Sequence, residues 1–263
     1  MDANSSFRTP TNGMVLMSVC REGETGTSLK SRVLEALDPN GTAGVIEEAT
    51  EVISEGGLVV YPTDTSYGLA CDPKQSISFE RLLAVKRRGR KLGVPLLFSD
   101  LAQFEEYHEF RNLERAIARI FWPGALTLLV AAGQRIPRYI TGGRESVAVR
   151  IPDHPIPCGI AAKIQGPIVG TSANRSGGPS PFEVSAAIEQ LRDDVDLYID
   201  GGPSRTHRDS TIVGVEGSKD EKGPHDIKIF REGQLTADRL TEMLRADPDA
   251  LGLWTTHFVY ADI

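Results

Sequence analysis

The segment from Gly166 to Pro181, which reads GPIVGTSANRSGGPSP, constrains the fold of this chain more than any other stretch. Pro167 to Gly170 is a short, partly β-branched run that predicts a buried strand, and it leads at once into hydroxyl and amide side chains between glycines. In open α/β sheets, ligands bind where strands pass into loops, and glycine lets backbone N–H groups approach an anion closely. The segment therefore predicts either a ligand-binding loop or a surface turn rich in serine, asparagine and glycine.

A second segment has the same arrangement earlier in the chain. Leu58 to Tyr61 predicts a strand, and Pro62 cannot donate to a β-ladder, so the residues after it form a loop. Asp64 and Thr65 on this loop either face a ligand or cap the turn that follows. Two strands that end in hydroxyl groups predict a binding site at their ends.

A cluster of cations closes a predicted helix at 78–88. Lys86, Arg87, Arg88, Arg90 and Lys91 follow one another within six residues. Cations at a helix C-terminus complement its dipole, but that effect accounts for only about two of them. The remaining charge suits a triphosphate, whose oxygens accept charge-assisted hydrogen bonds from lysine and arginine.

Arg150 stands near the end of an apolar run at 147–151 that predicts an interior strand. An arginine in such a place is almost never fully buried without an anionic partner. The partner is either a carboxylate of this chain, with Asp153 and Glu145 as candidates, or the carboxylate of a ligand.

The order of the remaining elements predicts the fold class. Further strands are expected at 95–98, 126–131, 197–199, 211–215 and 227–230, and further helices at 43–55, 113–121, 184–191 and 237–244. This alternation predicts an α/β fold, with a mixed twisted sheet of about seven strands and flanking helices in one domain. The domain is expected at 42–245, after an irregular N-terminal arm at 1–41 with a short helix around Leu29 to Leu37, and before a C-terminal tail at 246–263.

Composition excludes several classes of protein. The 263 residues carry a net charge of −7, which disfavours tight, non-specific binding of nucleic acid. The three cysteines form no CxxC pair, so neither a disulfide framework nor a zinc site is expected, and a reducing cytoplasm is the expected location. No apolar run is long enough for a membrane span, and no secretory or transit leader is expected. The familiar nucleotide motifs GxxxxGK[S/T] and GxGxxG are missing, so a nucleotide site would be of another kind.

Seven stretches, taken in order, resemble the YrdC/Sua5 family of L-threonylcarbamoyladenylate synthases. They are GGLVVYPTDTSYGLA, the Lys86-x-Arg88 pair, WPGALTLLV, SVAVRIPDHP, GTSANRSGGPSP, DSTIV at 209–213 and FREG at 230–233. The resemblance covers about Ala43 to Leu235. The chain ends too soon for the extra C-terminal domain of the Sua5-type members, so a single-domain, YrdC-type protein is expected.

The resemblance implies a nucleotidyltransferase that condenses L-threonine, bicarbonate or CO2, and ATP to threonylcarbamoyladenylate and pyrophosphate, with Mg²⁺ accompanying ATP and no protein-bound metal. The product would serve N6-threonylcarbamoylation of adenosine 37 in tRNA by a separate transferase machinery, without tight binding of tRNA by this chain. Lys86, Arg88, Ser172 and Asn174 match the family's catalytic KxR and SxN elements. By similarity the ATP-binding set adds Ser146, Ser180 and Arg231, and the threonine-binding set is Thr65, Arg150, Ser210 and Thr211.

The chain departs from the family pattern beside the cation cluster. Pro95 lies two residues further from Lys86 than the family's proline usually does, and Ser99 stands where longer members carry a histidine. Two other functions stay open. One is a carbamoyl- or acyl-adenylate-forming enzyme on the same scaffold, and the other is a non-catalytic RNA-binding module.

Overall fold

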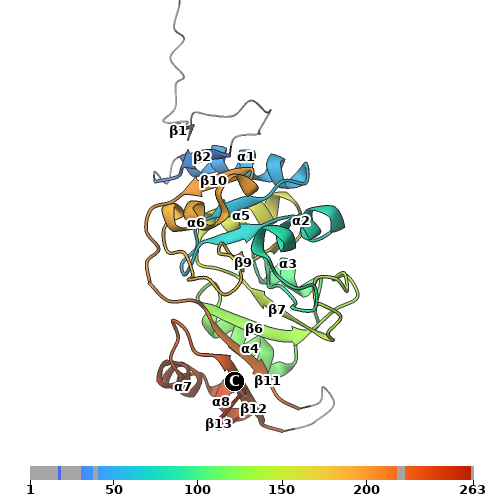
Figure 1. Ribbon diagram of the computed structural model, residues 1–263. Helices are drawn as coiled ribbons and strands as arrows, with labels where there is room; N and C mark the ends of the chain where they lie inside the picture. Colours follow the sequence, from blue (N-terminus) through green and yellow to red (C-terminus); the bar gives the residue numbers. More distant parts are fainter. Residues whose placement is uncertain (1–16, 19–30, 38–40, 218–222, 262–263) are drawn as a thin grey trace, which may run out of the picture.

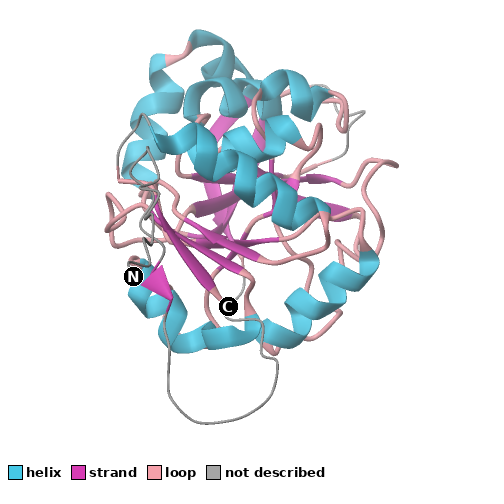
Figure 2. Ribbon diagram, turned by 90° about the horizontal axis from the view of Figure 1, so that it is seen from above, coloured by secondary structure: helices cyan, strands magenta, loops and turns pink. Residues whose placement is uncertain are grey.

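The computed structural model describes residues 17–18, 31–37, 41–217 and 223–261. The expected mixed α/β fold with flanking helices is confirmed, but its strands form two sheets. Figure 1 shows β2 and β10 at one end of the molecule and β11, β12 and β13 at the other. Helices lie outside the strands (Figure 2). Within the described ranges, no helix is both long and apolar enough to cross a membrane.

The six-stranded sheet has the order β1-β2-β10-β3-β4-β9. Its strands are β1 (Met17–Ser18), β2 (Arg32–Glu35), β10 (Leu197–Asp200), β3 (Val59–Tyr61), β4 (Gly68–Ala70) and β9 (Thr171–Ser172). β10 pairs in parallel with both β2 and β3, whereas β3–β4 and β4–β9 are antiparallel. The antiparallel β3–β4 pair turns the chain back at 62–67, so the Thr65 loop lies at the end of this sheet.

The seven-stranded sheet has the order β13-β12-β11-β6-β7-β5-β8. Its strands are β13 (Trp254–Tyr260), β12 (His225–Arg231), β11 (Thr211–Val215), β6 (Leu126–Ala131), β7 (Ser146–Arg150), β5 (Leu96–Leu97) and β8 (Ile168–Val169). β11 runs parallel to β6, and β6 runs antiparallel to β7. The beginning of β11 and the end of β7 therefore lie at the same end of this sheet, on either side of the beginning of β6.

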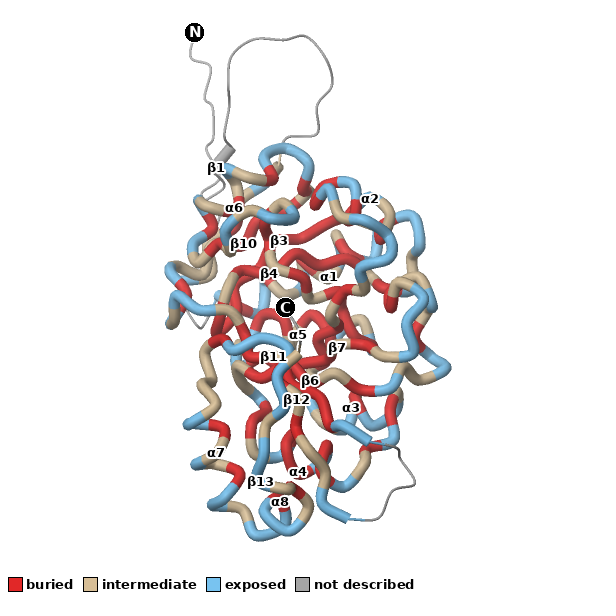
Figure 3. Tube along the Cα trace, turned by 60° about the horizontal axis from the view of Figure 1, so that its bottom comes forward, coloured by how far each residue is buried: buried red, intermediate tan, exposed pale blue. Residues whose placement is uncertain are grey.

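The helices cover the outer faces of the sheets. They are α1 (Thr42–Ser54), α2 (Ser76–Lys86), α3 (Leu101–Glu105), α4 (Asn112–Phe121), α5 (Pro155–Lys163), α6 (Val184–Leu191), α7 (Ala237–Ala246) and α8 (Pro248–Leu253), with a short 3-10 turn η2 (Arg192–Asp194). α1 buries Val45, Ala49 and Ile53 at helical spacing, as expected for an amphipathic helix. Figure 3 shows the buried residues concentrated on the strands and the exposed ones on the outer helices.

The segment 166–181 crosses from one sheet to the other, which its single predicted strand did not anticipate. β8 pairs with β5 in the seven-stranded sheet, and β9, only one residue later, pairs with β4 in the six-stranded sheet. Gly170 is the residue between them, and a Cβ atom there would lie 2.3 Å from the Leu97 side chain. A glycine is therefore required at the crossing, because any larger side chain would collide with β5.

The ends of the chain differ from the sequence prediction. The helix expected around Leu29 to Leu37 is wrong where the structure describes it, because Arg32–Glu35 form β2 and extend the six-stranded sheet. The rest of the predicted arm lies largely outside the described residues. The segment predicted as a C-terminal tail includes α8, which packs on α4, and β13, which pairs with β12.

Candidate active site

A cavity of about 530 Å³ takes its lining from both sheets. The six-stranded sheet supplies Gly68, Ser172 and the loop after β3, and the seven-stranded sheet supplies the facing residues of β6, β7, β11 and β12. The predicted site residues that line it are Thr65, Arg88, Ser146, Arg150, Ser172, Ser210 and Arg231. The two hydroxyl-ended strands recognised in the sequence therefore do open into one cavity.

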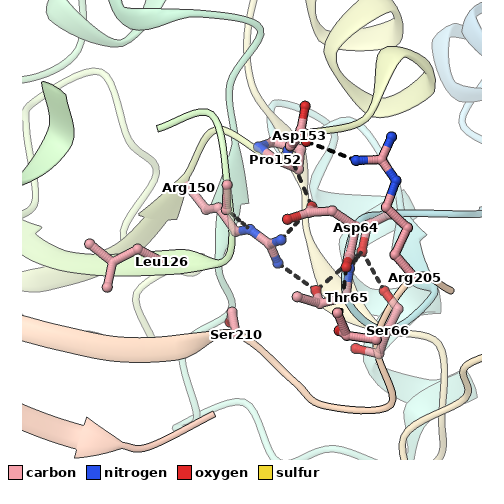
Figure 4. Close-up of polar contacts among 12 residues, drawn as sticks. Asp64, Thr65, Ser66, Leu126, Arg150, Pro152, Asp153, Arg205 and Ser210 are labelled. Atoms are coloured by element: carbon pink, nitrogen blue, oxygen red, sulfur yellow. Dashed lines mark hydrogen bonds and ion pairs between the residues drawn. The ribbon is translucent and has the colours of Figure 1, made fainter. Parts of the chain in front are cut away.

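Arg150, which lines this cavity, forms a buried ion pair with Asp64 (Figure 4). Its Nη2 donates to Asp64 Oδ1 at 2.5 Å, its Nη1 donates to Thr65 Oγ1 at 2.7 Å, and its Nε donates to the Gly124 carbonyl at 2.8 Å. Arg150 and Asp64 are 6% and 8% exposed. A guanidinium carries five N–H groups, so these three bonds leave others for a ligand in the cavity.

The anionic partner of Arg150 within the chain was predicted wrongly. It is Asp64, on the loop after β3, and neither Asp153 nor Glu145. Asp153 instead pairs with the exposed Arg205 at 2.9 Å, while its backbone N–H donates to Asp64 Oδ1 at 3.2 Å. The pairing joins the loop after β3 to the end of β7, a long-range contact that strand periodicity does not reveal.

Local hydrogen bonds fix the loop that carries Thr65. The Thr63 hydroxyl donates to the Ser66 carbonyl at 2.7 Å and accepts from the Thr65 N–H at 3.0 Å. Thr63 thus performs the turn-capping role that was considered for Asp64 and Thr65. Their side chains are left to contact Arg150 at the cavity.

The predicted cation cluster separates into distinct environments. α2 ends at Lys86, and Arg87 adopts a left-handed conformation with a φ of 52°. The chain turns at Arg87, so that Arg88 lines the cavity and Lys86 does not. Arg88 lines the cavity and donates through Nη2 to the Gly93 carbonyl at 2.8 Å. Arg87 is exposed, and Arg90 pairs with Glu80 at 2.8 Å on the surface.

Lys86 lies behind the cavity wall and is 1% exposed. Its ammonium group donates to the carbonyls of Ser172 and Asn174, the latter at 2.7 Å, and contacts Asn174 Oδ1 at 3.4 Å. Burial, with a further contribution from the Arg88 charge, lowers the pKa of Lys86 to about 7. Lys86 therefore holds the 172–174 loop in place from behind.

The 172–180 loop is connected to the cavity through side-chain hydrogen bonds. Ser172, which lines the cavity, donates to Asn174 Oδ1 at 2.6 Å, and Asn174 Nδ2 donates to the Gly178 carbonyl at 2.6 Å. Ser180 donates to Asp209 Oδ2 at 2.8 Å. Asn174 and Ser180 thus do not line the cavity, but each is hydrogen-bonded to a residue that does, Ser172 and Asp209 respectively.

Arg231 and Ser210 form one corner of the cavity. Arg231 Nη2 donates to the Ser210 carbonyl at 2.8 Å and to its Oγ at 3.1 Å, and Ser210 also shares a hydrogen bond of 2.8 Å with Thr127. Thr211 is not brought to the cavity. It is fully buried, and its hydroxyl donates to the Leu235 carbonyl at 2.6 Å.

Sequence reasoning gave no role to Asp209, which lines the cavity and orders its polar wall. Its two carboxylate oxygens accept from Ser66 Oγ at 2.7 Å and from Ser180 Oγ at 2.8 Å, and its Oδ2 lies 4.0 Å from Arg231 Nη1. Asp209 is the one carboxylate of the lining among the described residues. Its position directly before Ser210 at the start of a strand was the signal that could have identified it.

Comparisons with known proteins agree with this architecture. The Sua5/YciO/YrdC family model, described as "Telomere recombination", matches residues 51–233. A Mycobacterium tuberculosis protein is 32% identical over 222 residues, which are 84% of this chain and 99% of that protein. Threonylcarbamoyl-AMP synthase of Vibrio vulnificus is 32% identical over 170 residues, which are 64% of this chain and 91% of the relative.

Solved structures of the family have the same fold. Pyrococcus abyssi Sua5 complexed with L-threonine superposes with a TM-score of 0.73 and 29% identity, covering 80% of this chain and 60% of that chain. Escherichia coli YciO superposes with a TM-score of 0.66 and 22% identity, and the match covers 77% of this chain and 94% of the YciO chain. At this identity the likeness supports the fold alone. The chain therefore spans less than two thirds of Sua5 but nearly all of YciO. With the family model matched from 51 to 233 and its fold reproduced around one polar cavity, this chain belongs to the Sua5/YciO/YrdC family.

Proposed function

We propose that this protein is an L-threonylcarbamoyladenylate synthase, a nucleotidyltransferase that condenses L-threonine, bicarbonate or CO2, and ATP. The observation that carries the proposal is the pairing of two kinds of subsite in one cavity. Arg150 with Thr65 offers N–H and hydroxyl groups to a carboxylate, and Arg88 and Arg231 offer guanidinium groups to phosphates. The names of the relatives, and the P. abyssi Sua5 structure with L-threonine, support these substrates.

The reaction forms and breaks two sets of bonds. The threonine amine forms a C–N bond with the carbon of CO2 and loses a proton to solvent, or with the carbon of bicarbonate and releases water, to give a carbamate. A carbamate oxygen then attacks the α-phosphorus of ATP, and the bond between the α-phosphorus and the bridging oxygen breaks to release pyrophosphate. Such a reaction requires in-line positioning and stabilisation of phosphate charge rather than a covalent nucleophile.

The residues of the cavity suit these tasks. Arg150 and Thr65 would hold the threonine carboxylate, with Ser210 beside them. Arg88, Arg231, Ser146 and Ser172 would surround the phosphates. Lys86, Asn174 and Ser180 would act on the nucleotide through the hydrogen bonds that order the 172–180 loop. Thr211 has its hydroxyl bound to the 233–235 backbone, so the threonine subsite is assigned without it.

Mg²⁺ would enter with ATP. Within the described part of the chain, no group of three or more acidic, histidine or cysteine residues could hold a metal ion. Mg²⁺ usually takes one or two carboxylates together with substrate phosphates and water, and Asp209 on the cavity wall fits that requirement. When bound, the ion would neutralise part of the phosphate charge.

The product would supply a separate transferase that modifies adenosine 37 of tRNA. The net charge of −7 disfavours tight binding of tRNA by this protein. We also propose that the protein acts in the cytoplasm, where its product would reach that transferase.

The proposal predicts which substrates pyrophosphate release requires. Purified protein with Mg²⁺ and ATP should release pyrophosphate only when both L-threonine and bicarbonate are present. Serine should be a poor substitute, since its missing methyl group is worth on the order of 1 kcal/mol in an apolar niche. Release without threonine but with carbamoyl phosphate would favour a carbamoyl-adenylate-forming enzyme. Tight tRNA binding at physiological salt without any release would favour the RNA-binding module.

A further inference from the structure

Arg144 is a cavity-lining cation that belongs to none of the sequence motifs. It lies in the loop between β6 and β7, two residues before Ser146, and its side chain lines the same cavity as Arg88. Arg88 comes from the loop after α2, so two segments more than fifty residues apart in sequence each contribute a guanidinium group. Two like charges from distant segments therefore line the same cavity.

The two loops are packed tightly against one another. The Val94 N–H donates to the Ile140 carbonyl at 3.0 Å. A Cβ atom on Gly93 would lie 2.8 Å from the Thr141 oxygen, and one on Gly142 would lie 2.6 Å from the Lys91 oxygen. Only glycine permits such close backbone approach, so the position of Arg144 beside the Arg88 loop is fixed by the backbone.

In the part of the chain that the structure describes, no carboxylate pairs with either guanidinium group. Among the described residues, Arg88 donates only to the carbonyls of Leu92 and Gly93, and Arg144 has no ion pair. The neighbouring Arg90 and Arg135 do have carboxylate partners, Glu80 and Glu106. Burial, together with the charge of Arg144, lowers the pKa of Arg88. Two adjacent cations without a counter-ion favour an anion bound between them.

The exposure of the three cavity arginines Arg150, Arg88 and Arg144 indicates which phosphates of ATP would bind between Arg88 and Arg144. Arg150 is almost fully buried, whereas Arg88 is half-buried and Arg144 is exposed. The α-phosphate must meet the threonine carbamate near Arg150, and the leaving group must depart toward solvent. The exposed end of the cavity is therefore the place for the terminal phosphates.

We propose that Arg144 and Arg88 together form the subsite for the β- and γ-phosphates of ATP, which leave as pyrophosphate. The inference rests on the proposed function and extends it to a residue outside the recognised motifs. Arginine suits this task because its planar fork binds two phosphate oxygens at once. A bound pyrophosphate removes the repulsion between the two guanidinium groups, so the subsite prefers a polyanion to a single phosphate.

Calorimetric titration of the full-length protein with inorganic pyrophosphate and, separately, with AMP tests the assignment. Arg144→Ala should weaken pyrophosphate binding about tenfold or more and AMP binding by less than about threefold, as expected for loss of one charged phosphate contact. Arg144→Lys, which keeps the charge but loses the fork, should fall between Arg144→Ala and the wild type. Arg138→Ala is the matched control, because Arg138 is an exposed cation of the same loop that does not line the cavity.

Each other outcome overturns the assignment. If Arg144→Ala and Arg138→Ala have equal effects on pyrophosphate, Arg144 is an ordinary surface cation. If AMP and pyrophosphate binding fall equally, Arg144 does not distinguish the terminal phosphates, and absence of pyrophosphate binding by the wild type removes the subsite altogether. The titration needs neither threonine nor bicarbonate, so a failure of the proposed reaction would leave this binding pattern intact and is distinguishable from it.

Discussion

Replacing Arg150 with methionine should lower the free energy of unfolding by about 3–5 kcal/mol and reduce threonine-dependent pyrophosphate release to background. The first effect follows because Asp64, at 8% exposure, would be left as a buried charge without its partner. The second follows because Thr65 and the cavity floor would lose the guanidinium group that faces a ligand carboxylate. Urea unfolding measures the first effect and a coupled pyrophosphate assay the second.

Two further variants separate the loss of stability from the loss of threonine use. Arg150→Lys retains a positive charge near Asp64, so the variant should fold. It should still lose threonine-dependent pyrophosphate release, because lysine cannot bind a carboxylate with two parallel hydrogen bonds as a guanidinium group does. Arg205→Met removes the exposed ion pair with Asp153 and should cost less than about 1 kcal/mol, as surface pairs usually do. Equal destabilisation by Arg150→Met and Arg205→Met would mean that the buried pair does not organise the site. Normal threonine use by Arg150→Lys would remove Arg150 from the threonine subsite.

Replacing Lys86 with methionine should weaken ATP binding about tenfold or more, although Lys86 does not line the cavity. Its ammonium group holds the carbonyls of Ser172 and Asn174, and without it these buried acceptors lose a charged donor and the loop loses its position. Calorimetric titration with ATP measures the change. Arg87→Ala is the control on the adjacent, exposed residue. An equal, small effect of both substitutions would show that the contacts of Lys86 do not order the ATP site.

The same lysine predicts how stability depends on pH. The folded pKa of Lys86 is lowered to about 7, whereas an unfolded lysine keeps its ordinary value of about 10.4. Between these values the unfolded chain binds more protons than the folded one, so the contribution of Lys86 to the free energy of unfolding should rise with pH, by up to about 1.4 kcal/mol per unit. Urea unfolding at pH 7 and pH 9 should show a larger rise for the wild type than for Lys86→Met, and parallel profiles would contradict the prediction.

The sequence predicted the parts of this fold that local patterns determine. α1 and α4 follow their apolar periodicity, and β6, β7 and β11 follow their β-branched runs. The cavity walls followed from hydroxyl groups placed at strand ends, because a strand end and its loop are local features. Thr65, Ser172 and Arg88 do share one cavity, as the sequence suggested.

The sequence could not predict contacts that depend on how the two sheets meet. β8 and β9 are each two residues long, too short for any periodic signal, and the crossing at Gly170 depends on the proximity of Leu97. The Asp64–Arg150 pair joins residues 86 positions apart. β2 is held between β1 and β10, and β13 is held at the edge of its sheet by pairing with β12; residue propensity within these segments does not reveal such pairings.

Formation of a labelled adenylate tests the proposed reaction most directly. The protein is incubated with ATP, Mg²⁺, L-threonine and ¹³C-bicarbonate, and the nucleotide products are analysed by mass spectrometry. The expected product is a threonylcarbamoyl-AMP that carries one ¹³C atom and is absent when threonine is omitted. An adenylate without the label, or ATP converted only to ADP or AMP, would contradict it.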